Sequence, residues 1–324
     1  MMTANRNLEH GRSRACQRGL TLVELMVALT LGLMITLAVG TAYVQSSRST
    51  AEDDRYLRMI ENGRFALSMV VTDLKMTSFW GELIDPGSIT TGVTADEDCD
   101  TDILDAGSAI LVNSPNGSPA VTQFDINSTG CAALMGTVRA NTMQIVTKHT
   151  TGVALETGAV DDVLYLRSNG ASGTIIDDAG STAPPAGFAD WALDPSLYYV
   201  REEAGDLPRL CRLRLAGKGF GAVTNTECVA DGIEQLHVEF GLDTDNDGLV
   251  NQYKSNPTTT EMGAALTARV WVLVRSDTAD PAYTNTKTYQ LGDLAVAAAN
   301  DNFYRRVFSS TVELRNPANL ATLR

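Results

Sequence analysis

The chain lacks proline throughout its N-terminal quarter and lacks charge over a long run within it. The first proline is Pro86, and Glu24 is the only charged side chain between Leu20 and Ser47. Because proline interrupts helices, its absence permits one long helix. We expect this helix to span about 60 residues, from Leu20 to about Phe79, and its apolar first part of about 25 residues is long enough to cross a bilayer.

The chain is also poor in histidine and in positive charge, which limits the functions that it can have. The chain has 3 histidines, of which only His149 and His237 lie beyond the first residues, and it contains no G-x-S-x-G or H-E-x-x-H pattern. General-base chemistry therefore has few candidates, and we do not expect an enzyme. The net charge of −14 argues against nucleic-acid binding, which depends on Lys and Arg. Arg209, Arg212 and Arg214 are interpreted as a solvated strand face.

The 5 cysteines contain no C-x-x-C pair, so we do not expect a zinc site or any required cofactor. Cys16 lies in the basic N-terminal segment, which leaves an even number in the rest of the chain. An even number in an oxidising compartment favours two disulfides, for which three connectivities are open. We favour Cys99–Cys131 and Cys211–Cys228, because each closes a short loop.

The segment Gly19–Met26 opens the apolar run and carries its one carboxylate, Glu24. A charge at the centre of a bilayer costs roughly 2.5–3.5 kcal/mol on insertion scales, so an acidic residue here predicts a function. A secretory signal would place its small residue after a short apolar core, whereas Gly19 precedes this one. An ordinary membrane anchor explains neither Gly19 nor Glu24. The arrangement resembles the type IV prepilin signal.

Charge predicts the topology. Residues 1–19 hold four arginines and one glutamate, a net +3, so the rest of the chain carries −17 to give the total of −14. The positive-inside rule then predicts a single pass of the inner membrane, with a cytoplasmic N-terminus and a periplasmic C-terminus.

Beyond residue 85, short β-type runs alternate with Gly, Asp, Asn, Ser and Pro. We expect an α+β fold, in which the long N-terminal helix packs on an antiparallel β-sheet head, as in pilins. Gly170–Gly187 is interpreted as a long loop. The expected strands are Ala109–Val112, Met143–Thr147, Val163–Arg167, Leu197–Arg201, Leu210–Leu215, Leu236–Phe240, Arg269–Arg275 and Val307–Leu314. The expected segments are a leader (1–19), a membrane or filament-core helix (20–45), an amphipathic helix (46–80) and the head (81–324).

A loop rich in aspartate follows one of these runs. Asp243, Asp245 and Asp247 occupy the first, third and fifth positions of a calcium-loop pattern, and the sixth is glycine. The Leu249 carbonyl and Asn251 would complete the set. Position twelve is Lys254 rather than glutamate, so this is not a standard EF-hand. A calcium site and an Asx-rich turn between two strands both remain open.

Three further stretches resemble minor pilins of the PilW family. They are Glu61–Leu67, the aspartate loop with the strand ending at Ser276, and Tyr304–Asn316. The resemblance implies that prepilin peptidase cuts between Gly19 and Leu20 and methylates the new Leu20 amine. It also implies that Glu24 pairs with the amine of a neighbouring subunit. The leader is longer than in many pilins, Leu20 replaces phenylalanine or methionine, and the usual mid-helix proline is missing.

The family further implies a subunit that primes pilus assembly with other minor pilins, the major pilin and the inner-membrane assembly platform, and then enters the pilus. Two alternatives stay open: a type II secretion pseudopilin, and a tip adhesin or DNA-uptake module.

Overall fold

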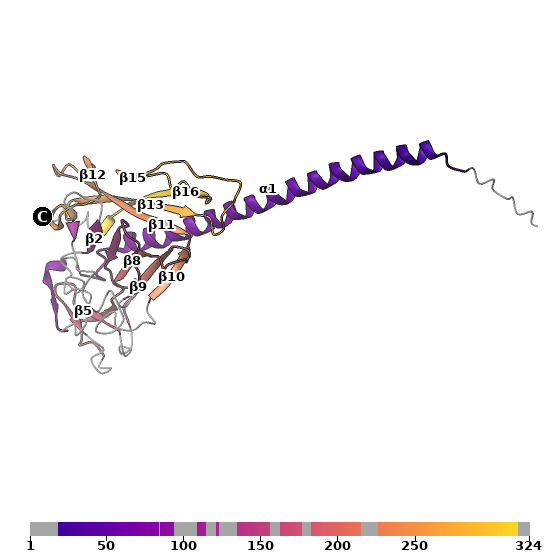
Figure 1. Cartoon of the computed structure of the whole chain (residues 1–324). Helices are drawn as coiled ribbons and strands as arrows, with labels where there is room; N and C mark the ends of the chain where they lie inside the picture. Colours follow the sequence, from indigo (N-terminus) through magenta and orange to yellow (C-terminus); the bar gives the residue numbers. More distant parts are fainter. Residues whose placement is uncertain are drawn as a thin grey trace, which may run out of the picture. The chain divides into compact units, whose positions relative to one another are not determined.

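The structure is a computed structural model that describes residues 19–83, 85–93, 109–114, 121–122, 135–155, 163–176, 183–214 and 226–316. Contacts divide the chain between Asp54 and Arg55 into two units, and each is considered by itself. One helix, α1 (Leu22–Met76), contributes residues to both and is the indigo-to-violet ribbon of Figure 1. It passes through Gly32, Gly40 and Gly63 without a break.

Helix α1 ends shortly before a residue with left-handed backbone conformation. Ser78 takes a positive φ of 62°, the left-handed conformation that commonly closes a helix. The Ser78 N–H donates to the carbonyl of Lys148, which fixes the chain as it leaves the helix. The observed helix is therefore slightly shorter at both ends than the expected Leu20–Phe79.

The head contains the strands and the last part of α1, in the α+β architecture expected from the sequence. A four-stranded sheet has the order β12-β11-β13-β16, and a six-stranded sheet has the order β10-β9-β8-β4-β2-β3. Strands of the first are β11 (Ile233–Leu242), β12 (Gln252–Lys254), β13 (Ala265–Arg275) and β16 (Arg305–Glu313). Strands of the second are β2 (Ile110–Ser114), β3 (Val121–Thr122), β4 (Gln144–Thr147), β8 (Ser196–Arg201), β9 (Arg209–Arg214) and β10 (Thr226–Asp231).

Smaller elements complete the described head. A second four-stranded sheet has the order β1-β6-β5-β7, and β14 pairs with β15 in a hairpin. The β1–β6 pair is parallel, and the other paired strands in the described ranges are antiparallel. The bounds are β1 (Ile89–Thr91), β5 (Tyr165–Ser168), β6 (Gly173–Ile176), β7 (Ala189–Ala192), β14 (Tyr289–Leu291), β15 (Leu294–Val296), the short helix α3 (Thr259–Met262) and a 3₁₀ turn (Pro86–Ser88).

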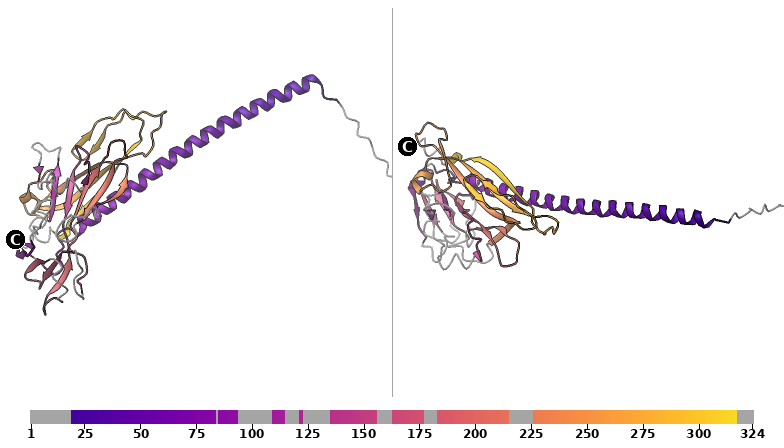
Figure 2. Two further views of the ribbon diagram at one scale, coloured as in Figure 1. Left: turned by 60° about the horizontal axis from the view of Figure 1, so that its bottom comes forward. Right: turned by 45° about the horizontal axis from the view of Figure 1, so that its top comes forward.

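The main core joins α1 to both large sheets. Its helical members repeat at three- and four-residue spacing, which gives an apolar stripe on one face. The stripe packs against the inward residues of β11, β13 and β16 and those of β4 and β8. Both views in Figure 2 show the last turns of α1 among the strands of the head. The helical residues of the core are Met59, Ala66, Leu67, Val70, Val71 and Leu74.

One expectation needs correction. Gly170–Gly187 is not a continuous loop, because β6 (Gly173–Ile176) forms within it and pairs with β5 and β1. On β11, Leu236, Val238 and Phe240 belong to the main core. His237 and Glu239 alternate with them and are also buried, at 3% and 7% accessible.

Candidate functional site

The predicted cleavage point lies just before α1. Gly19 and Leu20 are exposed and precede the first helical residue, Leu22. Backbone outside regular structure is the preferred substrate of proteases. The Gly19–Leu20 peptide bond therefore lies in exposed backbone outside regular secondary structure.

Glu24 has a partner within its own chain. Glu24 Oε2 accepts hydrogen bonds from the Thr21 backbone N–H at 3.0 Å and from the Thr21 hydroxyl at 3.1 Å. In return, Thr21 Oγ1 accepts the backbone N–H of Glu24 at 3.3 Å. This reciprocal pair is a capping box, which satisfies donors at the start of a helix. Sequence reasoning missed it, although Thr-x-x-Glu before an apolar run is its signature.

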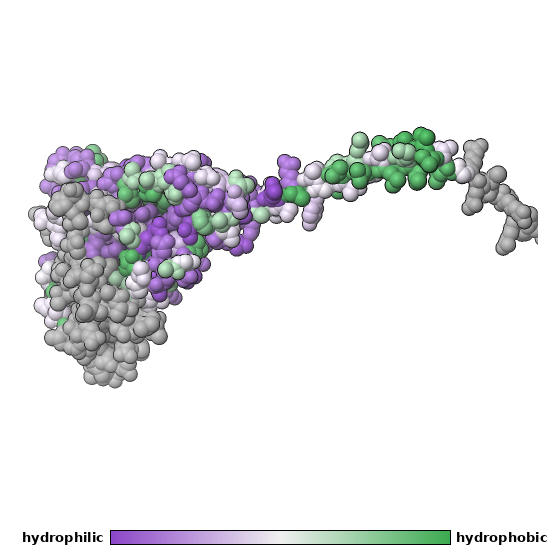
Figure 3. Space-filling model, viewed as in Figure 1, coloured by the Kyte–Doolittle hydropathy of each residue, from purple (hydrophilic) through white to green (hydrophobic). Residues whose placement is uncertain are grey.

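The apolar run that follows is not covered by other residues that the structure describes. All residues of α1 from Leu22 to Asp54 are exposed, and Leu37 keeps 62% of its accessible surface. One stretch of α1 is long and apolar enough to cross a membrane. Figure 3 shows the hydrophobic side chains as green along this part of the helix. A surface of this size marks an interaction site, with a membrane or with other proteins.

The aspartate loop brings its three carboxylates together. One oxygen from each of Asp243, Asp245 and Asp247 lies within 4.8 Å of the others. Asp243 is buried and accepts the backbone N–H groups of Asp247 at 3.2 Å and Gly248 at 2.8 Å. Burial acts to raise the pKa of Asp243, but these backbone hydrogen bonds outweigh it and hold the pKa below its usual value.

The other two predicted calcium ligands have different surroundings. Asn251 Oδ1 accepts the backbone N–H of Thr244 at 2.8 Å, so it closes the base of the loop. Leu249 donates its N–H to Asp247 Oδ1 at 2.8 Å, and its side chain is exposed. The loop is thus an Asx-rich turn with three clustered carboxylates, which is compatible with either of the two interpretations.

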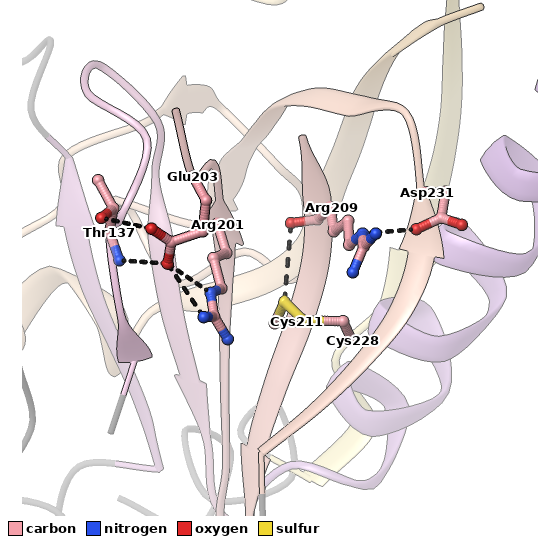
Figure 4. The surroundings of a disulfide bond; sticks show 7 residues. All are labelled: Thr137, Arg201, Glu203, Arg209, Cys211, Cys228 and Asp231. Carbon is pink, nitrogen blue, oxygen red and sulfur yellow. Dashed lines mark hydrogen bonds and ion pairs between the residues drawn. A yellow bond between two sulfur atoms is a disulfide. The ribbon is translucent and has the colours of Figure 1, made fainter. Parts of the chain in front are cut away.

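Cys211 and Cys228 form a disulfide between neighbouring strands β9 and β10 (Figure 4). Arg209 and Asp231 form an ion pair beside it, with 3.0 Å between Nε and Oδ1. On the other side, Glu203 accepts hydrogen bonds from Thr137 and Arg201. Cys99 and Cys131 lie outside the described residues, so their pairing stays a prediction.

The basic residues of β9 do not form a free positive patch. Arg212 pairs with Glu227 at 3.1 Å, and Arg214 pairs with Asp194 at 2.7 Å. Together with the Arg209–Asp231 pair, these contacts neutralise the strand. The expected solvated strand face fits Arg209 and Arg214, which are exposed, whereas Arg212 is partly covered, with 14% of its side-chain surface accessible.

A second cluster was not predicted. His237 and Glu239 on β11 meet Asp293, which lies in the turn between β14 and β15. Burial lowers the pKa of His237 against the opposing effect of Asp293. Burial also disfavours the charged form of Glu239, and for a carboxyl group this raises the pKa. The alternation of β11 places His237 and Glu239 on one face, but no pattern in the sequence relates them to a residue more than fifty positions later.

Comparison with known families agrees with the geometry at both ends of the chain. A family model described as the prokaryotic N-terminal methylation motif matches residues 14–40. A model described as Type IV Pilus-assembly protein W matches residues 197–316, which include β11, β13, β16 and the aspartate loop. No curated protein and no solved structure matches the chain.

An exposed apolar helix that begins at a methylation motif, and continues into a helix-on-sheet head, defines the class of type IV pilus-related, pilin-like proteins. Such domains are structural proteins, and the N-terminal motif and helix fit a membrane-anchored pilin. Within this class, the match over residues 197–316 is consistent with a PilW-family prepilin-like protein.

Proposed function

We propose that the protein is a minor pilin that primes type IV pilus assembly within an initiating complex at the pilus tip. The observation that carries this proposal is the exposed apolar half of α1, which directly follows Gly19 and Leu20 and belongs to a chain with a PilW-type head. The head buries its own core, whereas this half of the helix needs an apolar environment supplied from outside.

The first step of the proposed mechanism is hydrolysis of the Gly19–Leu20 peptide bond by prepilin peptidase, followed by methylation of the new Leu20 amine. Gly19 has no side chain to obstruct the peptidase, and the bond lies outside the helix. Cleavage removes a leader of net +3 and creates a positive charge one residue before the capping box.

Glu24 then acts in assembly. While the helix is in the membrane, the capping box reduces the cost of the carboxylate by supplying two donors from Thr21. In the filament, the Leu20 amine of a neighbouring subunit supplies a full counter-charge, which compensates the buried carboxylate more completely. The apolar surface from Leu22 to Val44 leaves the bilayer and packs against the same segment of other pilins.

The topology and partners follow from this scheme. The positively charged leader stays in the cytoplasm and the acidic head lies in the periplasm, in agreement with the positive-inside rule. The partners are prepilin peptidase, other minor pilins, the major pilin and the inner-membrane assembly platform. The ion-paired state of Arg209, Arg212 and Arg214 supports the expectation that nucleic acid is not a partner.

Substitutions at the junction test the proposal, with Gly19→Val expected to leave an uncut precursor. Glu24→Gln separates charge from capping, because glutamine also serves in a capping box but carries no charge. We expect Glu24→Gln to be cut normally and to reduce surface pili strongly. Thr21→Ala removes the cap, worth about 1 kcal/mol, and keeps the charge, so pili should form in larger numbers than with Glu24→Gln.

Mass spectrometry of the mature N-terminus and counts of sheared pili measure both effects. Normal piliation in Glu24→Gln would show that Glu24 acts only as a helix cap. Deletion of the whole gene separates the alternatives: loss of exoprotein release with normal pili would indicate a secretion pseudopilin. Pili that form normally but fail to adhere or to take up DNA would indicate a tip-binding module.

We also propose calcium binding at the aspartate loop, since a cation would relieve repulsion among the three clustered carboxylates. Asp245→Asn is the informative variant, because Asp245 is exposed whereas Asp243 holds the loop backbone. Calorimetry of the purified protein should show calcium binding that Asp245→Asn weakens. No calcium heat together with no calcium-dependent shift in Tm would refute this site.

A further inference from the structure

The face of β11 that points away from the main core carries a histidine and a carboxylate. His237 and Glu239 are two residues apart, so they share this face. Both are buried, although neither belongs to an apolar cluster. Burying an imidazole or a carboxylate costs free energy unless the group has a hydrogen-bond partner, an ion-pair partner or a metal ion.

The β14–β15 hairpin supplies the third group. Its turn places Asp293 Oδ1 2.7 Å from His237 Nε2. One ligand atom from each of His237, Glu239 and Asp293 lies within 4.8 Å of the other two. Asp293 keeps 57% of its side-chain surface accessible, which provides a route from solvent to the cluster.

The two carboxylates are held in place by neutral donors. Ser255 donates its hydroxyl to Asp293 Oδ2 at 2.6 Å, and the Asp293 backbone N–H donates to Glu239 Oε1 at 2.7 Å. Gly292 makes the second contact feasible: its φ is +61°, and a Cβ there would collide with Glu239 Oε1. Such outer hydrogen bonds to the ligands are typical of metal sites.

The local charge also favours a cation. Among the described residues, Arg269 is the cross-strand neighbour of Glu239 and supplies one positive charge against the two carboxylates. Arg269 also stacks on the ring of Tyr253, with 3.5 Å between its guanidinium carbon and the ring centroid. The imidazole adds a neutral nitrogen ligand. One histidine and two carboxylates form a ligand set that first-row transition metals prefer over calcium.

We propose that His237, Glu239 and Asp293 bind one divalent transition-metal ion, with Zn²⁺ as the ion to test first, and that this ion fastens the β14–β15 hairpin to β11. The ion takes the place of the proton between His237 Nε2 and Asp293 Oδ1. The ring stays neutral because Nδ1 takes up a proton from solvent as Nε2 gives one up to solvent, so no net proton is released. Zn–N and Zn–O bonds of about 2.1 Å place tetrahedral ligands about 3.4 Å apart, so the two atoms need to separate by less than about 1 Å. Water from the open side completes the coordination.

This site differs from the aspartate loop in its ligands, and that difference makes the test specific. The full-length protein, purified in detergent and stripped with a chelator, is titrated with Zn²⁺ in competition with a chromogenic chelator. Asp293→Asn and His237→Gln remove one ligand each, and Ser255→Ala removes an outer hydrogen bond. Asp245→Asn makes the same carboxylate-to-amide change in the aspartate loop and serves as the matched control.

We expect the wild type to bind one more Zn²⁺ than Asp293→Asn or His237→Gln, with at least about a 100-fold loss of affinity at this site in either variant. Ser255→Ala should weaken binding about tenfold, as outer-ligand changes do. Asp245→Asn should leave Zn²⁺ affinity unchanged. Co²⁺ in place of Zn²⁺ should give visible absorption bands in the wild type that Asp293→Asn removes.

Equal Zn²⁺ binding by the wild type and both ligand variants would overturn the proposal, as would the absence of binding. Loss of binding in Asp245→Asn alone would assign the ion to the other cluster and likewise overturn it. Since His237 is buried, its variant could unfold. The Tm of each metal-free variant is therefore measured first, and Asp293→Asn, on an exposed turn, decides the result if His237→Gln is unstable.

Discussion

The two halves of α1 differ in how the chain uses their apolar side chains. Leu22–Asp54 is exposed throughout, whereas Arg55–Met76 buries a stripe of residues in the main core. The backbone is the same continuous α-helix in both. Hydrophobicity therefore serves two purposes here: it folds the head in one half, and in the other it remains available to a membrane or to neighbouring subunits.

The difference also appears in the polar residues that accompany each half. The first half has its capping box at the very start, with both partners exposed. The second half is tied to the head by ion pairs, such as Arg58 with Asp277 at 2.9 Å, and by Asn62 donating to the Asp231 carbonyl at 3.0 Å. The head thus fixes one half through polar contacts as well as burial.

The sharpest test of this comparison is a matched leucine pair. Leu74 is fully buried, so Leu74→Ala should lower the free energy of unfolding of the head by about 2–5 kcal/mol. Leu37→Ala, at an exposed position, should change it by less than about 0.5 kcal/mol. All three tryptophans, Trp80, Trp191 and Trp271, lie in the head, so denaturant titration followed by fluorescence reports its unfolding. Equal destabilisation by the two substitutions would contradict the division into two units.

A covalent constraint distinguishes the head further. Removal of the Cys211–Cys228 disulfide by a double alanine substitution frees a loop of 17 residues and should lower head stability by about 3 kcal/mol. The first half of α1 contains no cysteine, so its helicity in detergent should stay the same. Fluorescence and circular dichroism measure the two parts separately. A head whose stability does not change on reduction would argue that the disulfide has no structural role.

Sequence reasoning located the helix and most of the large sheets because their patterns are local. The absence of proline and the long apolar run indicate α1, and the expected strand Arg269–Arg275 lies within β13, an inner strand of its sheet. The Cys211–Cys228 pair followed from loop length and is present in the structure. These features depend on residues close together in the chain.

Features that join distant segments were missed. Asp293 meets His237 only because the β14–β15 hairpin covers β11, and no local pattern encodes that contact. Burial of both faces of β11 likewise depends on segments far away in the chain. The strand β6 within a glycine- and serine-rich stretch forms because β5 and β1 pair with it on both sides. Thr174, Ile175 and Ile176 are β-branched and favour a strand, but the surrounding glycine- and serine-rich residues obscure this local signal.

Two glycines, one in each half of α1, allow the packing around the helix to be compared. A Cβ on Gly63 would lie 2.5 Å from the Phe308 ring, whereas a Cβ on Gly40 meets nothing within 4 Å. Alanine adds about 1 kcal/mol of helix propensity at either site. At Gly63 overpacking costs about 1–3 kcal/mol, so Gly63→Ala should destabilise the head by up to about 2 kcal/mol. Gly40→Ala should leave head unfolding unchanged and slightly increase helicity, and the same two methods measure both variants. A stabilised head in Gly63→Ala would show that Phe308 moves aside freely.

The smallest expected effect is a change in head stability at low pH. Arg305 donates to both oxygens of Asp301, at 2.6 and 2.7 Å, and these hydrogen bonds hold the pKa of Asp301 below its usual value. A carboxyl whose pKa is lower in the folded state stabilises the fold above its unfolded pKa of about 3.9, and this contribution is lost as pH falls through the lower folded pKa. The wild type should therefore exceed Asp301→Asn in head stability at neutral pH, and the difference should shrink below about pH 4. Denaturant titration at several pH values measures it. Since Arg305 also holds the buried Glu234, at 2.6 Å, a difference that persists at low pH would instead indicate that the substitution disturbs the Arg305–Glu234 pair.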